Sequence, residues 1–150
     1  MRKLLIASVT ALSCLACAGS AFAADDAFPQ VYHKSDFIVK DRDKLGGTGE
    51  GIVHCEYAFP RDKATADQAI AEIAWLTLPA GASIGLHKHD KNEDSYVIVS
   101  GKGVFIDGDN KETPVTAGDV TIARLGDSHS IKNTGTEPFV LLDIVTTPKK

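Results

Sequence analysis

The stretch GLHKHDKNED, residues 85–94, places two histidines one residue apart and follows them with three carboxylates. On an extended strand alternate side chains share a face, so His87 and His89 are expected to point the same way. Two imidazoles held side by side form a pair of metal ligands. A histidine pair alone is also compatible with a polar surface strand, so the residues that follow decide between the two interpretations.

The run after this pair has the alternation of a strand with one buried face. One face carries Asp94, Tyr96 and Ile98, and the other begins with Glu93. If Tyr96 and Ile98 face the interior, Asp94 does so as well, and its carboxylate lies beside the imidazoles. A third histidine, His129, comes well downstream in the sequence.

The rest of the chain consists of short β-rich runs separated by turn residues. Glycine, asparagine and aspartate stand between the runs, where the chain has to reverse. This spacing predicts an all-β fold, an antiparallel sandwich or barrel. The expected strands cover residues 37–39, 52–59, 70–78, 83–87, 95–100, 104–107, 112–116, 120–123 and 139–146.

One segment departs from this rhythm. Residues 61–74 are rich in alanine, aspartate, glutamine and glutamate, and would form a helix on propensity alone. The mostly apolar residues 73–78, however, lead directly into a turn at Pro79. We therefore expect residues 62–67 to form a loop with at most one helical turn, and a strand to begin at Ile70.

The sequence around the histidine pair resembles the first motif of the cupin family, G(x)5HxH(x)3–4E(x)6G. Gly81, His87, His89 and Gly101 fall into this spacing. Asp94 stands seven residues before the last glycine, where the family has glutamate. This departure puts the identity of the carboxylate ligand in question.

A downstream segment resembles the second cupin motif, G(x)5PxG(x)2H(x)3N. Four residues match it in spacing: Gly118, Gly126, His129 and Asn133. Arg124 stands where the family has proline. The two motifs cover residues 81–133, and the alternation of strands and turns extends the resemblance over most of the chain.

The resemblance implies a double-stranded β-helix, a small jelly-roll barrel that holds one divalent metal ion. It also implies a ligand set of three histidines and one carboxylate, carried over as His87, His89, Asp94 and His129. Three arrangements stay open because aspartate is shorter than glutamate: Asp94 reaches the metal, a β-bulge turns Glu93 inward, or water takes the carboxylate position. The alternation favours Asp94. Such mixed ligation suits manganese, iron, nickel, copper or zinc without choosing among them.

A few other side chains are candidates for chemistry. Tyr96, on the expected inner face, is the candidate catalytic residue because it could donate a hydrogen bond to a bound oxyanion; it could equally be an aromatic that fills the barrel. Arg124 could bind a substrate carboxylate or lie solvated at the rim. Cys55 is expected in the core, with His54 pointing the opposite way. Glu93, if it is not a ligand, could orient a histidine.

The N-terminal residues have the pattern of a secretory signal peptide. Residues 1–3 are a short basic start, residues 4–18 are an apolar run interrupted only by small or weakly polar residues, and residues 21–23 form a small-x-small cleavage pattern. The apolar run is too short to span a bilayer, and the sequence contains no second one. We expect residues 1–23 to be removed, which leaves residues 24–150 as a single cupin domain, periplasmic or secreted, in a bacterium.

Charge and cysteine content limit the partners. The formal net charge of −4 argues against nucleic acid as a ligand. Cys55 is the only cysteine after residue 23, so an intramolecular disulfide is excluded in the mature chain. The resemblance further implies a homodimer, with residues 35–59 as the edge that packs against a second copy.

The resemblance leaves three functions open. One is a metalloenzyme that acts on an oxygen-rich small molecule, as a decarboxylase, dioxygenase or isomerase. Another is a non-catalytic module that captures a carboxylate or a sugar through the metal. The third is a structural cupin in which the metal only stabilises the barrel, and the full ligand set argues against it. A fold by itself does not choose among them, because function depends on the groups around the metal.

Overall fold

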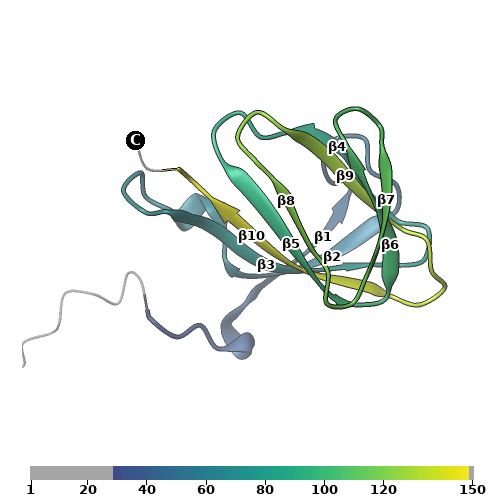
Figure 1. Ribbon diagram of the computed structural model, residues 1–150. Helices are drawn as coiled ribbons and strands as arrows, with labels where there is room; N and C mark the ends of the chain where they lie inside the picture. The colour runs from purple at the N-terminus through teal and green to yellow at the C-terminus, as the bar shows by residue number, and fades with distance from the viewer. Residues whose placement is uncertain (1–28, 149–150) are drawn as a thin grey trace, which may run out of the picture. The chain divides into compact units, whose positions relative to one another are not determined.

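The structure, a computed structural model, describes residues 29–148 (Figure 1). The chain divides into two units, Met1–Gln30 and Val31–Lys150, and the fold reported below is that of the second. The predicted signal peptide, residues 1–23, lies outside the described residues. Between residues 29 and 148, no helix is long and apolar enough to cross a membrane.

The all-β prediction is confirmed. Residues 29–148 contain ten strands and two short 3-10 helices, η1 (Lys34–Asp36) and η2 (Arg61–Lys63). The strands are β1 (Ile38–Asp43), β2 (Ile52–Phe59), β3 (Ile70–Leu78), β4 (Ser83–Lys88), β5 (Glu93–Ser100), β6 (Lys102–Asp107), β7 (Glu112–Thr116), β8 (Val120–Ala123), β9 (Ser128–Asn133) and β10 (Phe139–Thr146). Segment 61–74 divides as expected, with a helical turn at η2 and a strand from Ile70.

The strands form two antiparallel sheets. The larger has the order β1-β2-β3-β10-β5-β8 and the smaller the order β4-β9-β6-β7 (Figure 1). Alternate residues of both sheets are buried together in one hydrophobic core, with Leu76 and Leu141 from the larger sheet and Ile84, Val115 and Ile131 from the smaller. Strands far apart in sequence therefore meet around a common interior.

Strand β9 was not predicted, although it carries His129. Its sequence, SHSIKN, contains one apolar residue and lacks the alternation that marks a strand with one buried face. The strand is stabilised instead by pairing on both sides, with β4 and with β6. β1 also extends to Asp43, beyond the expected end at Val39, and its charged residues are exposed at the edge of the larger sheet.

The predicted turn glycines adopt the expected conformation. Gly81, Gly101, Gly118 and Gly126 all have positive φ, between 78° and 96°. Asn133 stabilises a turn, because its amide donates to the carbonyls of Leu78 and Glu137 at 2.9 and 2.8 Å. The second motif therefore has a structural role in addition to supplying His129.

Gly85 lets the loop before β2 lie directly against β4. The Gly85 amide donates to the Leu45 carbonyl at 2.8 Å, and the Ser83 amide donates to the Glu50 carbonyl at 2.9 Å. A Cβ atom on Gly85 would lie 2.5 Å from the backbone nitrogen of Gly49. Backbone thus packs on backbone two residues before His87.

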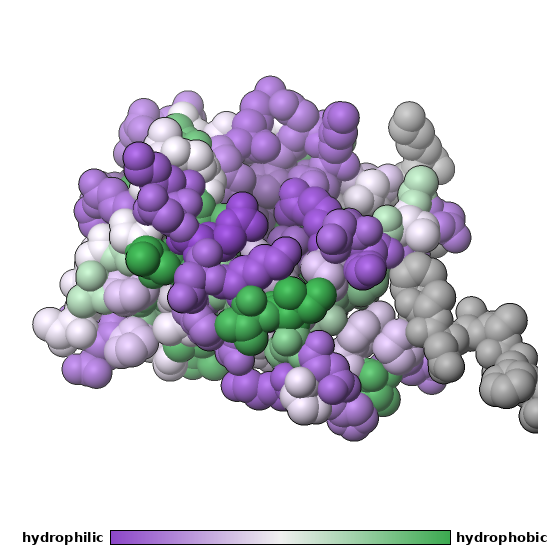
Figure 2. Space-filling model, turned by 180° about the vertical axis from the view of Figure 1, so that it is seen from behind, coloured by the Kyte–Doolittle hydropathy of each residue, from purple (hydrophilic) through white to green (hydrophobic). Residues whose placement is uncertain are grey.

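The exposed surface is mixed in character. Hydrophilic side chains predominate on the face shown in Figure 2, and hydrophobic ones gather in a smaller group among them. Other hydrophobic residues are exposed singly, such as Val39 and Ile70, and single exposed hydrophobic residues are ordinary in folded proteins. Strand β1 has one unpaired edge, and the homodimer expected through residues 35–59 stays a prediction.

We expect Gly85→Ala to lower the free energy of unfolding by about 1–3 kcal/mol, because the added methyl group has no space beside Gly49. Urea unfolding measures this change. Gly108→Ala is the matched control, since its Cβ would meet the nearest atom at an ordinary 3.5 Å, and it should shift stability by less than about 0.5 kcal/mol. Equal effects of the two substitutions would contradict the close packing described for Gly85.

Candidate metal centre

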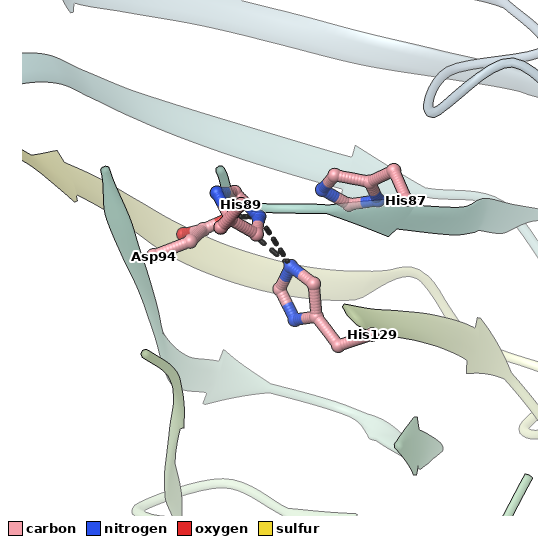
Figure 3. A group of neighbouring side chains, drawn as sticks. All are labelled: His87, His89, Asp94 and His129. Atoms are coloured by element: carbon pink, nitrogen blue, oxygen red, sulfur yellow. Dashed lines mark hydrogen bonds and ion pairs between the residues drawn. The ribbon is translucent and has the colours of Figure 1, made fainter. Parts of the chain in front are cut away.

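Four predicted residues from three segments of the chain converge on one point (Figure 3). His87 lies in β4 and His89 directly follows it, Asp94 lies in β5, and His129 lies in β9. The register of β4 and β9 places His87 directly opposite His129. One ligand atom from each of the four residues lies within 4.8 Å of all the others, so the group could hold a metal ion.

The shortest distances in this cluster lie between two histidine nitrogens and between each of these nitrogens and a carboxylate oxygen. His89 Nε2 lies 2.9 Å from His129 Nε2. Asp94 Oδ2 lies 3.3 Å from His129 Nε2 and 3.5 Å from His89 Nε2. The side chains of His89, Asp94 and His129 are at most 4% exposed, whereas His87 is half-buried and faces the solvent side.

Hydrogen bonds outside the cluster orient two of the histidines. His87 Nδ1 donates to the Gly85 carbonyl at 2.8 Å, and His89 Nδ1 donates to the Asn92 side-chain oxygen at 2.7 Å. A hydrogen on Nδ1 leaves the Nε2 lone pair of each ring free. The lone pairs then point into the cluster, which is the orientation that metal ligation requires.

Packing, and not a hydrogen bond to a residue outside the cluster, orients the third histidine. The His129 ring stacks on Tyr96 at a centroid distance of 5.1 Å and an interplanar angle of 17°, and Phe105 lies against it at 5.6 Å. Its Nδ1 is buried without a hydrogen-bond partner. Two aromatic neighbours therefore fix the ring with Nε2 toward His89 and Asp94.

The two buried carboxyl groups near the cluster differ in protonation. Burial alone would raise the pKa of Asp94, but its hydrogen bonds with His129 and Asp143 outweigh burial and lower that pKa. Burial, followed by the charge of Asp94, raises the pKa of Asp143 well above its usual value. Asp94 is therefore the charged carboxylate, and Asp143 is a neutral acid beside it.

The charge state of His87 agrees with ligation. Burial is the main cause that lowers the pKa of His87, and the neighbouring histidines lower it further against the Gly85 hydrogen bond. Burial, and then the Asp94 charge, raise the pKa of Tyr96, so its phenol keeps its proton. A neutral imidazole is the form that binds a metal ion.

These residues fit a divalent transition metal. Three imidazoles and a carboxylate are ligands that such ions accept. Asp94 Oδ1 is buried without a hydrogen-bond partner, although an unpaired buried carboxylate oxygen is costly. A cation at the centre of the cluster would offset the charge of Asp94, whose Oδ2 faces the histidine nitrogens.

The structure distinguishes between the predicted carboxylates. Glu93 lies on the opposite face of β5 from Asp94 and takes no part in the cluster.

Arg124 is exposed and does not line the cavity at the cluster, which fits the solvated interpretation. Cys55 packs in the core, and His54 is on the surface, 2.8 Å from Asp41, as predicted.

A cavity of about 570 Å³ borders the cluster. Exposed side chains at Lys88, Asp90 and Lys91 line its mouth, and Tyr57, Leu76, Ile84 and Tyr96 line its interior. Its volume falls within the range of small-molecule sites, about 300–1,000 Å³. The cavity also contains Arg42, Arg61, Glu72 and Asp143, which the sequence analysis did not single out.

The contact of His89 with Asn92 gives a direct test of the ring orientation. We expect Asn92→Ala to weaken zinc binding by about 10–100-fold, because His89 loses the acceptor that fixes its Nδ1 hydrogen. Titration calorimetry of the metal-free protein measures this change. Asn92→Asp keeps an acceptor at the same position and should restore most of the affinity. Unchanged zinc affinity in Asn92→Ala would contradict the orienting role.

The segment that carries the four-residue cluster matches a known protein family. Residues 74–145 match the family described as "Cupin domain". A curated relative, an oxalate-binding protein from Thermotoga maritima, is 39% identical over 100 residues, which cover 67% of this chain and 78% of the relative.

Solved structures share the fold. A predicted oxalate decarboxylase from Thermotoga maritima superposes with a TM-score of 0.70 and 33% identity, over 79% of this chain and 99% of the other. A Cupin 2 conserved barrel domain protein from Salinispora arenicola gives a TM-score of 0.52 with 22% identity, over 62% and 74%. The second likeness concerns the fold alone, and together the two confirm the predicted β-barrel.

Proposed function

Because this chain belongs to the cupin family, we propose that it is an exported metalloenzyme that binds one divalent ion and acts on a small carboxylate anion. The main support for this proposal is that ligand atoms of His87, His89, Asp94 and His129 lie within 4.8 Å of one another beside a cavity. The names of two relatives, which mention oxalate, supply the ligand class. The signal-peptide pattern of residues 1–23 supports export.

The bound ion would be one of manganese, iron, nickel, copper or zinc, held by the four ligands. It would supply Lewis acidity to a carboxylate oxygen and leave open positions for the substrate. Tyr96 keeps its proton and lines the same cavity, which supports a role for its phenol as a hydrogen-bond donor to a substrate oxygen. Buried aromatic and aliphatic side chains line the cavity beside it, including Tyr57, Leu76 and Ile84.

A second candidate is capture of the carboxylate without turnover. The name of one relative, an oxalate-binding protein, favours this function. In that case the cluster would still bind the metal and the cavity would still bind the carboxylate, and Tyr96 would contribute only to the affinity for the carboxylate. Measurement of turnover separates the two candidates.

Metal content tests the ligand set. We expect His87→Ala and His129→Ala each to lower the affinity for Zn²⁺ or Mn²⁺ by about 100-fold or more, since each removes one coordinating nitrogen and leaves Asp94 uncompensated. Elemental analysis and calorimetry measure the loss. His54→Ala, a surface histidine outside the cluster, is the control and should retain full metal content. Full metal content in His129→Ala would refute the proposed centre.

Turnover tests the enzyme function. Metal-loaded protein is expected to convert a small carboxylate such as oxalate, which takes up one proton and splits into formate and carbon dioxide. Tyr96→Phe should lower the rate of turnover by about 100-fold, because it removes a positioned proton donor. The metal content should stay unchanged. Metal-dependent binding without product, for oxalate and for other small carboxylates, would reject the enzyme in favour of the binding module.

A further inference from the structure

Arg42 reaches the metal cavity from the edge strand β1. Its Cα partner on β2 is Val53, whose side chain is fully buried in the core. Directly opposed residues of an antiparallel pair project from the same face of a sheet, so Arg42 also projects inward. The side chain lines the cavity that borders the metal cluster, although the residue is exposed at the cavity's outer end.

Arg42 differs from two neighbouring cations, Lys88 and Arg61, because within the described part of the chain its charge has no ion-pair partner. Lys88 pairs with Asp90 at 2.8 Å, and Arg61 pairs with Glu72 at 3.4 Å. Within residues 29–148, no carboxylate lies within 4.0 Å of the Arg42 guanidinium. Its charge is felt inside the cavity, where it opposes the burial that raises the pKa of Tyr57. A planar guanidinium of this kind is suited to bind a carboxylate through two parallel hydrogen bonds.

The route from the metal cluster to Arg42 crosses much of the larger sheet. Strands β10, β3 and β2 lie between β5, which carries Asp94, and β1, which carries Arg42. Neighbouring strands are about 4.8 Å apart, so a two-carbon acid at the cluster is too short to touch Arg42. Tyr57 and Leu76 supply an apolar wall on this route, and both line the cavity.

We propose that Arg42 binds a second carboxylate at the end of the cavity away from the metal cluster, so that the preferred ligand is a dicarboxylate longer than oxalate. This inference rests on the proposed function, because the metal has to hold the first carboxylate. The apolar wall at Tyr57 and Leu76 accommodates the methylene groups between the two charged ends. Arg42 is then a specificity-determining residue of the site.

Calorimetry with a ligand series tests the proposal. Zinc-loaded protein is titrated with oxalate, succinate, glutarate and adipate, and with monocarboxylates of the same chain lengths as the last three. We expect at least one longer dicarboxylate to bind about tenfold or more tightly than its matched monocarboxylate, which is the scale of a hydrogen-bonded charge pair. Arg42→Gln should reduce this ratio to about twofold or less and leave monocarboxylate affinity unchanged.

Arg124→Gln is the matched control, because it removes the same charge from an exposed residue that does not line the cavity. It should keep the wild-type ratio. The proposal is overturned if Arg42→Gln keeps the ratio, if it weakens both ligand classes equally, or if oxalate binds most tightly. If the wild type shows no preference for dicarboxylates while monocarboxylates still bind only in the presence of metal, the Arg42 proposal fails and the proposed function stays intact. Absence of any metal-dependent carboxylate binding in the wild type would refute both.

Discussion

The antiparallel pairing of β4 with β9 is the constraint on which the metal centre depends. It places His87 opposite His129, although the two residues are far apart in sequence, and it brings His89 to the same end of the smaller sheet. Asp94 then arrives from β5 of the facing sheet. Because a slip of one residue would turn alternate side chains to the other face, the register of β4 determines whether the cluster exists at all.

The surroundings of the cluster stabilise its members unequally. His87 and His89 are oriented by acceptors close in sequence, Gly85 and Asn92, whereas His129 is oriented by packing. Asp94 stays charged in a buried position with the help of His129 and of Asp143. Polar groups in such a setting are tolerated when they are paired, and a cation at the centre would complete the pairing.

Much of the site could be predicted from the sequence, because local spacing alone determines which residues of β4 and β5 share a face. The choice of Asp94 over Glu93 follows from that alternation, and the structure places Asp94 in the cluster. Strand β9 could not be predicted, since its polar sequence forms a strand only through pairing on both sides. Arg42 and Asp143 were missed for a similar reason: tertiary register, and no local motif, brings them to the cavity.

The packing of His129 against Tyr96 and Phe105 affects how the site responds to different ions. A buried ring packed against two aromatic side chains has little freedom to turn to suit the radius or angular preference of the incoming cation. The rotational entropy of this ligand is lost when the chain folds and is not lost again on metal uptake. Adjustment to different ions then falls mainly to the exogenous ligands, which no packing holds in place.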